Sequence, residues 1–257
     1  MTALRVSHLS KAYGGVRAVN DVSFEIARGE IVALIGPNGA GKSTCFNILN
    51  GQIRADSGSV VFMGDDITGL RPREVWRRGV GRTFQVPEIY GSMTVRENVQ
   101  MVLLSKAGKL YHPWRPANRM FREEALGLLS RVGMAAQSER PANVLAYGDV
   151  KRLELAMALA NDPILLLMDE PTAGMAPEER NALMALTSEL AAERNLAVLF
   201  TEHSMDVVFS YAHQLLVLSR GSIIAAGPPA MVRENKEVQD VYLGSAAFLD
   251  IREGARA

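Results

Sequence analysis

The chain has 257 residues, of which 48% are hydrophobic and 22% are charged, and this composition predicts a globular protein with a sizeable core. Its 28 basic side chains balance its 28 acidic ones, which excludes an overall electrostatic attraction to nucleic acid or to an anionic membrane surface. The one cysteine, Cys45, excludes an internal disulfide, and the apolar runs are far short of the ~20 residues of a membrane span.

The first third of the chain predicts a small, partly antiparallel β lobe. The strand candidates are Leu4–Leu9, Val22–Ile26 and Ser59–Phe62, and the turn candidates are Ala12–Gly15 and Arg54–Gly58. Because Met1–Ser10 alternates apolar and polar residues, it resembles a half-buried strand and not a signal peptide. We therefore expect a cytoplasmic protein.

A phosphate-binding loop follows the apolar run Ile31–Ile35. Residues 36–44 contain the complete pattern G-x-x-x-x-G-K-[ST], formed by Gly36, Pro37, Asn38, Gly39, Ala40, Gly41, Lys42, Ser43 and Thr44. Glycines let the backbone curl so that its N–H groups surround a triphosphate. Lys42 is then expected to reach the β and γ phosphates, and the Ser43 hydroxyl to bind Mg²⁺. The alternative is a glycine-rich turn that merely joins a strand to a helix.

Three short apolar runs alternate with helical stretches, which is typical of buried strands in a doubly wound parallel sheet. They are Ile31–Ile35, Ile164–Met168 and Ala197–Thr201. A nucleotide is expected at the ends of such strands.

Between these strands, residues 89–160 carry apolar positions at helical spacing and no good strand candidate. Helices are expected at Met120–Val132 and Asp149–Ala160, and a loop at Ala107–Asn118. A helical insert is therefore predicted, and a flexible tail is expected only at Arg252–Ala257.

The apolar run Ile164–Met168 ends in two adjacent carboxylates, Asp169 and Glu170. A buried strand would hold both acids rigidly beside the phosphate loop. Asp169 is expected to hold Mg²⁺ through water, and Glu170 to act as general base on the attacking water. Taken alone, two acids after a strand also fit an ordinary helix cap.

In this order, the motifs resemble those of the nucleotide-binding subunit of an ABC transporter, and the resemblance covers nearly the whole chain. Arg82-Thr83-Phe84-Gln85 is similar to the Q-loop, Leu145-Ala146-Tyr147-Gly148-Asp149 to the signature segment, and Thr201-Glu202-His203 to the switch-histidine segment. The resemblance implies an α/β fold of the P-loop NTPase (RecA-like) class: a parallel-sheet core with an N-terminal antiparallel β lobe and an inserted helical subdomain. A single nucleotide-binding domain, 1–257, would comprise a catalytic core with its β lobe (1–88 and 161–227), a helical subdomain (89–160) and a C-terminal extension (228–257).

The resemblance also implies roles for residues outside the phosphate loop. Tyr13 would stack on adenine, with Val19 padding the same pocket, unless Tyr13 simply packs under the β lobe. Gln85 would touch Mg²⁺ or the attacking water, unless it is an ordinary surface glutamine. His203 would donate to the γ-phosphate and orient Glu170 or the water.

The signature residues Ala146, Tyr147 and Gly148 would contact the γ-phosphate of ATP bound to a second subunit. Four features resemble one branch of the family, the ATPases of branched-chain amino-acid and related amide importers. They are the Leu-Ala-Tyr-Gly-Asp form, the segment Ala173–Pro177, the long loop in the helical insert and the segment Val241–Gly244. That branch often has glutamine, arginine, asparagine and aspartate at the positions held here by Val150, Met157, Ala176 and Ser204. Positions 150 and 176 lie near the expected subunit contact. His8, His112 and His213 lie in no motif, and we assign them no chemistry.

The function implied is ATP-driven import by a subunit at the cytoplasmic face of the inner membrane, with ATP and Mg²⁺. Its expected partners are integral-membrane permease subunits, a second, related but distinct ATPase subunit (or a second copy of this chain) and, indirectly, a periplasmic substrate-binding protein. Gln85–Tyr90 is the expected permease dock, although Val86, Ile89 and Tyr90 also fit a core. The substrate stays open among hydrophobic amino acids, urea, short amides and aromatic acids.

Two other functions stay open. One is export of the lipopolysaccharide type. The other is a non-transport ABC ATPase acting on DNA or ribosomes, which usually carries long coiled coils or a second nucleotide domain that this length does not accommodate. We expect no nucleic-acid partner.

Overall fold

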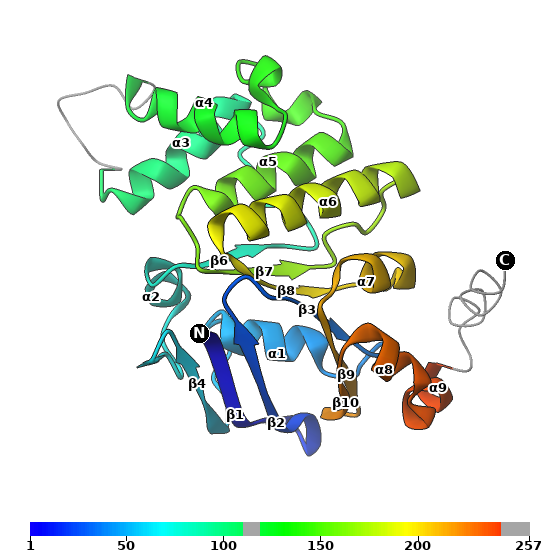
Figure 1. Ribbon diagram of the computed structural model, residues 1–257. Helices are drawn as coiled ribbons and strands as arrows, with labels where there is room; N and C mark the ends of the chain where they lie inside the picture. The colour runs from blue at the N-terminus through cyan, green and yellow to red at the C-terminus, as the bar shows by residue number, and fades with distance from the viewer. Residues whose placement is uncertain (110–118, 243–257) are drawn as a thin grey trace, which may run out of the picture.

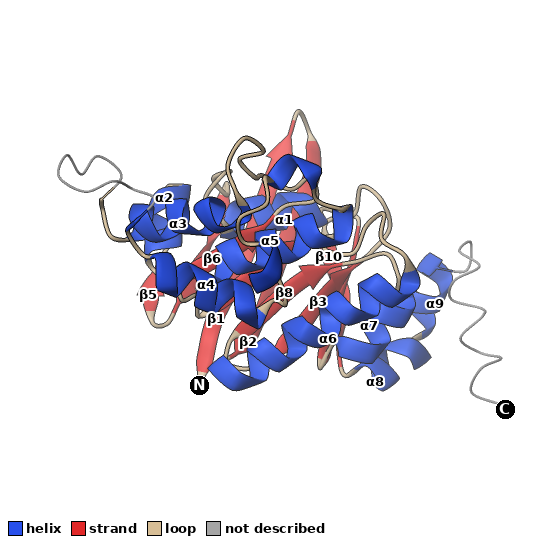
Figure 2. Ribbon diagram, turned by 90° about the horizontal axis from the view of Figure 1, so that it is seen from above, coloured by secondary structure: helices blue, strands red, loops and turns tan. Residues whose placement is uncertain are grey.

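The computed structural model describes residues 1–109 and 119–242, which form two β-sheets and the helices that cover them (Figures 1 and 2). The strands are β1 Thr2–Tyr13, β2 Val16–Ala27, β3 Ile31–Ile35, β4 Ser57–Phe62, β5 Asp65–Asp66, β6 Val80–Thr83, β7 Leu165–Asp169, β8 Ala197–Thr201, β9 Gln214–Ser219 and β10 Ser222–Gly227. The α-helices are α1 Lys42–Leu49, α2 Pro72–Arg77, α3 Val95–Lys106, α4 Arg122–Arg131, α5 Tyr147–Leu159, α6 Pro177–Arg194, α7 Met205–Tyr211, α8 Pro229–Glu234 and α9 Lys236–Tyr242.

The antiparallel sheet has the strand order β2-β1-β4-β5, as the predicted β lobe requires. Its first two strands are 12 residues each, longer than the sequence pattern indicated. The turn between them consists only of Gly14 and Gly15, whose φ angles of 51° and 91° suit a two-residue hairpin. The predicted turn over Ala12–Gly15 is therefore wrong at Ala12 and Tyr13, which belong to β1.

The second sheet has the order β10-β9-β3-β8-β7-β6, and its strands are parallel except for β10, which pairs antiparallel with β9. The three predicted strands are present as β3, β7 and β8, with β7 shifted one residue toward the C-terminus. Strands β6, β9 and β10 were not predicted. β6 is only four residues long and contains Gly81 and Arg82, so its strand character depends on pairing with β7.

Side chains of the parallel strands alternate between two hydrophobic clusters. Ile31, Ala33 and Ile35 of β3 belong to the cluster that includes α5 and α6, whereas Val32 and Leu34 belong to the cluster that includes α1. The second cluster also contains the inward side chains of β1 and β2, so α1 lies between the two sheets (Figure 1). Burial on both faces explains why these strands read as continuous apolar runs.

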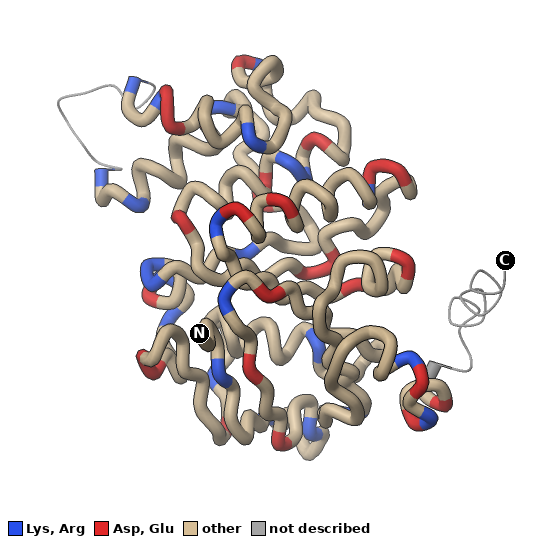
Figure 3. The backbone as a smooth tube through the Cα atoms, in the orientation of Figure 1, with Lys and Arg blue, Asp and Glu red and all other residues tan. Residues whose placement is uncertain are grey.

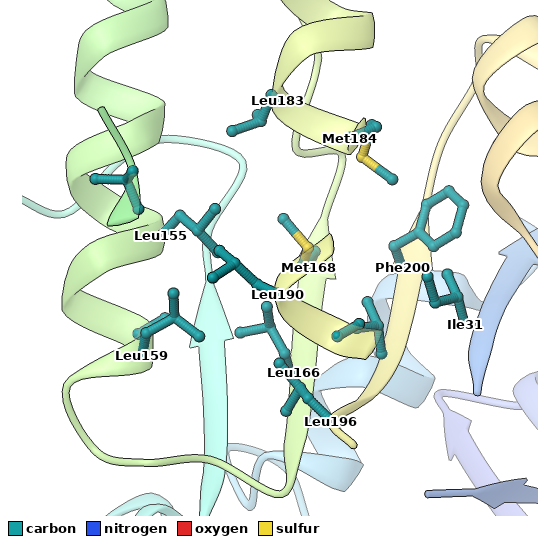
Figure 4. Close-up of a cluster of buried hydrophobic side chains, with 14 of the residues drawn as sticks. Ile31, Leu155, Leu159, Leu166, Met168, Leu183, Met184, Leu190, Leu196 and Phe200 are labelled. Carbon is teal, nitrogen blue, oxygen red and sulfur yellow. The ribbon is translucent and has the colours of Figure 1, made fainter. Parts of the chain in front are cut away.

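The cluster on the α5 and α6 side joins the helical region to the parallel sheet. Figure 4 shows its packing, with labelled side chains from α5 (Leu155 and Leu159), β7 (Leu166 and Met168), α6 (Leu183, Met184 and Leu190) and β8 (Phe200). Because α5 packs directly on the strands that end near Asp169, movement of this helix and the geometry of that strand end are mechanically linked.

The part of 89–160 that the structure describes is helical and contains no named strand. The two predicted helices are α4, two residues shorter at its start than expected, and α5, which starts two residues earlier than expected. α3 was not predicted separately, although Thr94 and Glu97 form a capping box at its start. Most of the predicted loop Ala107–Asn118, the tail Arg252–Ala257, and Leu243 and Gly244 of the family-like segment lie outside the described residues.

The start of the C-terminal extension is part of the packed structure. Val232 and Val238, from α8 and α9, are at most 3% exposed and join the same core as α5 and α6. None of the helices in the described portion is long and apolar enough to cross a bilayer. Basic and acidic residues are interspersed along the chain in Figure 3, in line with their equal numbers.

Candidate active site

The phosphate-loop sequence forms the tight connection between β3 and α1. Gly41 is the residue before α1 and has a left-handed φ of 108°. A Cβ atom on Gly36 would lie 2.1 Å from the carbonyl oxygen of Leu218, and one on Gly41 would lie 2.1 Å from that of Ala18. Only glycine fits at these two positions, because the loop passes directly against neighbouring backbone.

Lys42 is the first residue of α1, and its side chain folds back into the loop. It is 8% exposed, and its Nζ donates to the carbonyl oxygens of Gly36 at 2.7 Å and Pro37 at 3.1 Å. Burial lowers the pKa of Lys42, while the nearby Glu170 and Asp169 carboxylates oppose that shift. The loop thus holds a cation at the positive end of a helix, an arrangement suited to a polyphosphate. Pro37, Asn38, Gly39 and Ser43 are exposed beside it, whereas Ala40 is buried and Thr44 is half-buried.

Asp169 ends β7, and both of its carboxylate oxygens have partners. The Thr201 hydroxyl donates to Oδ1 at 2.8 Å, and Arg82 donates from Nη2 to Oδ2 at 3.4 Å. Arg82 itself reaches this point from β6, and its Nη1 donates to Gln52 at 3.1 Å. Burial lowers the pKa of Arg82, and Asp169 opposes that shift. The carboxylate is therefore held in a fixed direction at the strand end.

Glu170 is the meeting point of three segments. Gln85 donates from Nε2 to Oε2 at 2.9 Å, and the His203 ring nitrogen Nε2 lies 2.9 Å from Oε1, within donating distance. The backbone N–H of Glu170 donates to the Thr201 hydroxyl at 3.0 Å. Its φ of 46° is left-handed and uncommon for a glutamate. The structure thus brings Gln85, Glu170 and His203 together as the sequence motifs predicted.

A second buried carboxylate, Glu202, fixes the segment that carries His203. One oxygen accepts from the backbone N–H of Thr172 at 2.9 Å and from its hydroxyl at 2.6 Å. The other accepts from the backbone N–H of His203 at 3.1 Å. With 4% exposure, Glu202 is a structural tie between the residues after β7 and those after β8.

Tyr13 lies at the tip of the β1–β2 hairpin and is 47% exposed, so it does not pack under the β lobe. Lys11 lies with its Nζ 5.6 Å from the centre of the tyrosine ring, and Val16, paired opposite Tyr13, is 70% exposed. Val19, in contrast, has no exposed surface and belongs to the core beneath the hairpin. The strand's alternation points the Val19 side chain inward, and its part in a nucleotide pocket stays a prediction.

The signature-like segment forms the start of α5. Ala146 is the residue before the helix, and its side chain makes no capping hydrogen bond. Tyr147 is 43% exposed and Gly148 is buried against the carboxyl group of Glu179. The three residues lie at the N-terminus of α5, where the Tyr147 ring centre lies 5.9 Å from the Lys151 Nζ.

The positions where the chain departs from the importer branch have ordinary packing roles in the described structure. Ala176 and Ser204 directly precede α6 and α7, and the Ser204 hydroxyl accepts from Arg180 at 3.1 Å. Val150 and Met157 are half-buried on α5. Of the histidines without a motif, His8 lies beside Asp21 on the surface and His213 accepts from the backbone N–H of Ile31, while His112 lies outside the described residues.

Comparisons with known proteins decide the family. The profile of the ABC transporter family matches residues 19–173, well over half of the chain. The chain belongs to the ABC transporter ATP-binding family. A second profile, of the branched-chain amino acid ATP-binding cassette transporters, matches residues 222–247.

Individual relatives match this ABC cassette over nearly its whole length. The branched-chain amino acid transport ATP-binding protein BraF of Pseudomonas aeruginosa is 37% identical over 250 residues, which are 95% of this chain and 98% of the relative. LivG of Escherichia coli shows the same identity and coverage. The crystal structure of the ADP conformation of MJ1267, an ATP-binding cassette of an ABC transporter, superposes with a TM-score of 0.85 at 33% identity, covering 95% of this chain and all of that one. The predicted family, the P-loop fold class and the ATPase activity are thereby confirmed.

Several polar residues of this ABC cassette were missed by sequence reasoning. Thr201, Glu202 and Arg82 lay inside quoted motifs but were given no role, because their contacts come from other strands. Lys151 and Glu154 lie in the helix after the signature and bind the segment before Gln85. The only sequence signal for that pair is the appearance of two charged residues on an otherwise buried helix face.

The position of Thr201 generates a test. Replacing Thr201 by valine keeps the shape but leaves the Glu170 N–H and an Asp169 oxygen without their partner, so the free energy of unfolding should fall by about 1–3 kcal/mol. Thr201→Ser keeps the hydroxyl and is the matched control. Urea unfolding measures both, and a valine variant as stable as wild type would contradict the assigned contacts.

Proposed function

We propose that this cassette drives the uptake of branched-chain amino acids or a closely related small solute by hydrolysing ATP. The observation that carries the importer assignment is the near full-length match to relatives named as branched-chain amino acid transport ATP-binding proteins, together with the C-terminal profile match at residues 222–247. Urea, short amides and aromatic acids stay as alternative substrates. Nothing in the described structure favours lipopolysaccharide-type export or a nucleic-acid function.

The phosphate loop, residues 36–44, would bind the ATP phosphates. Its Lys42 ammonium is already oriented into the loop, and ATP would replace the Gly36 and Pro37 carbonyl oxygens as its partners. Tyr13, exposed at the tip of the neighbouring hairpin, would stack on the adenine ring. Because Tyr13 belongs to the antiparallel sheet, the adenine base would bind to that sheet while the phosphates bind to the loop that follows β3 of the parallel sheet.

The oxygen donors present fit a magnesium ion. The Ser43 hydroxyl, the Asp169 carboxylate and the Gln85 amide are hard ligands, and Mg²⁺ in nucleotide sites usually takes only a few protein ligands besides phosphate and water. No group of three or more His, Cys, Asp or Glu side chains in the described part of the chain is arranged to hold a metal ion, so the phosphates of ATP would supply part of the coordination. When bound, Mg²⁺ would neutralise charge on the transferring phosphoryl group.

Glu170 would accept the proton of the attacking water. Its two carboxylate oxygens are held by Gln85 and His203, and its backbone is fixed by Thr201, so the base is positioned before substrate arrives. His203 would turn from Glu170 to the γ-phosphate, since the imidazole has a donor in reach of both positions. The side chains that take part in hydrolysis would thus come from the ends of neighbouring strands.

A second ATPase subunit is needed to complete each site. Ala146, Tyr147 and Gly148 lie at the N-terminus of α5, where backbone N–H groups favour an anion, so they would meet the γ-phosphate of ATP on the partner. We propose a distinct, related ATPase as this partner, with a homodimer as the alternative. The helical subdomain 89–160 would then move against the core formed by 1–88 and 161–227, with 228–257 as a C-terminal extension.

The permease would dock in a groove between the core and the helical region. This groove has a volume of about 720 Å³ and is lined from α2, β6, α3 and α5, with Trp76, Phe84, Ile89, Tyr90 and Met157 among its apolar residues. Tyr90 is 51% exposed, whereas Val86 is 77% exposed and does not line the groove. Docking there would place the cassette at the cytoplasmic face of the inner membrane as a peripheral subunit, with a periplasmic binding protein acting on the far side.

The proposed general base is tested by Glu170→Gln. This variant should bind ATP but hydrolyse it roughly 10²- to 10⁴-fold more slowly, because the amide cannot take the proton of water. Glu189→Gln, an exposed glutamate on α6, is the matched control and should hydrolyse ATP normally. Phosphate release and nucleotide binding are measured on the same preparations, and normal turnover by Glu170→Gln would remove Glu170 from this role.

The proposed dock is tested by Tyr90→Glu. Replacing an exposed aromatic side chain of the groove by a carboxylate should weaken association with the permease subunits by about 2 kcal/mol, roughly 30-fold. Met231→Glu, at an apolar position on α8 that is 68% exposed and does not line the groove, serves as control. Co-purification from detergent-solubilised membranes measures the association, and equal recovery of permease with both variants would place the dock elsewhere.

A further inference from the structure

A buried ion pair lies on α5, one turn beyond the signature residues. Lys151 and Glu154 have side chains that are 2% and 6% exposed, and the Lys151 Nζ lies 3.4 Å from Glu154 Oε2. Buried ion pairs of this kind carry a desolvation cost that apolar residues of similar size avoid. Burial raises the pKa of Glu154, Lys151 and the Phe84 N–H oppose the shift, and Glu88 adds to it. Packing of α5 alone therefore does not explain the presence of the pair.

The pair binds the backbone just before and at Gln85. Glu154 Oε1 accepts from the Phe84 N–H at 2.6 Å. Lys151 Nζ donates to the carbonyl oxygens of Phe84 at 2.8 Å and Gln85 at 3.1 Å. We name these two side chains the α5 latch. It holds donor and acceptor groups of the same short segment, so the segment has to follow α5 when the helix moves.

The segment that the α5 latch holds leads directly to the catalytic carboxylate. Gln85 donates from its side chain to Glu170 Oε2 at 2.9 Å, while its backbone carbonyl is bound by Lys151. α5 itself begins at Tyr147, in the signature segment. A continuous set of contacts therefore runs from the signature end of α5, through the latch and Gln85, to Glu170.

We propose that Lys151 and Glu154 are positioning residues for ATP hydrolysis, which transmit the position of α5 to Gln85 and through it to Glu170. The inference rests on the proposed function, because it requires Gln85 and Glu170 to act in hydrolysis and the signature to meet a partner's nucleotide. Engagement of the signature would pull on α5, and the latch would carry that displacement to the chain's own general base. Each site would then respond to occupation of the other.

The decisive variant replaces both latch residues by apolar ones, Lys151→Met with Glu154→Leu. This exchange removes two buried charges at similar volume, which favours the fold, but it also takes away the partners of the Phe84 N–H and of two carbonyl oxygens. The free energy of unfolding should therefore stay within about 3 kcal/mol of wild type. The kcat of ATP hydrolysis should fall roughly 2- to 30-fold, the range typical of residues that couple two sites. The KM for ATP should change little, because the latch does not contact the phosphate loop in the described structure. Lys151→Arg keeps the charge and donors and should restore most of the rate.

A double-mutant cycle with Gln85→Ala separates transmission from general support of the structure. If the latch acts through Gln85, the apolar pair should slow the wild-type enzyme but have no further effect in the Gln85→Ala background. Additive losses in the two backgrounds, or a wild-type kcat in the folded double variant, would overturn the inference. If the double variant melts well below wild type, the cycle is repeated with Lys151→Met and Glu154→Gln, which leaves no unpaired buried charge and whose neutral amide oxygen can still accept from the Phe84 N–H.

The same cycle distinguishes failure of this inference from failure of the proposed function. Suppose that Gln85→Ala and Glu170→Gln both hydrolyse ATP slowly while the apolar double variant keeps the wild-type kcat. The proposed function would then stand, and the positioning role of Lys151 and Glu154 would be overturned. Normal hydrolysis by Gln85→Ala would remove Gln85 from the proposed mechanism, and the latch would be overturned with it.

Discussion

A buried ammonium group at the start of α1 is the feature on which the rest of this site depends. Lys42 is 8% exposed and donates to two loop carbonyls, with the carboxylates of Asp169 and Glu170 nearby. A buried charge is costly unless it is paired. The loop therefore holds a cation for which a polyphosphate is the natural partner, and the glycines at 36 and 41 allow the backbone to approach closely enough to form it.

The strand order explains how the other groups reach this point. In the parallel sheet, β3, β8, β7 and β6 are consecutive neighbours, and their carboxyl ends lie along one edge. The phosphate loop follows β3, His203 follows β8, Asp169 and Glu170 end and follow β7, and Gln85 follows β6. Residues that are up to 118 positions apart in the sequence, Gln85 and His203, both lie within 2.9 Å of one carboxyl group because of this order. The strand order thus brings the site residues together, because each of them lies at or just after the carboxyl end of one of these neighbouring strands.

The sequence predicted the parts of the fold that have a local signal. The phosphate loop, the acids after β7 and the apolar runs of β3 and β8 follow from residue type and spacing alone. Strands β6 and β9 pair with strands that are distant in the sequence, β7 and β3, and were missed for that reason. β10 pairs with β9, directly before it in the chain, and was missed with it. The inward direction of Val19 depends on the register of β2, which could not be fixed from the sequence. The contacts of Thr201, Lys151 and Glu154 are tertiary, and the local sequence does not show which groups these side chains bind.

The central claim is that the Lys42 ammonium is held in the loop in order to bind the phosphates of ATP, and equilibrium binding tests it most directly. Isothermal titration of ATP into Lys42→Ala is compared with wild type and with Lys236→Ala, an exposed lysine on α9. Loss of a charge-assisted contact should weaken ATP binding about 10- to 100-fold in Lys42→Ala and leave it unchanged in the control. A folded Lys42→Ala protein that binds ATP with wild-type affinity would contradict the claim.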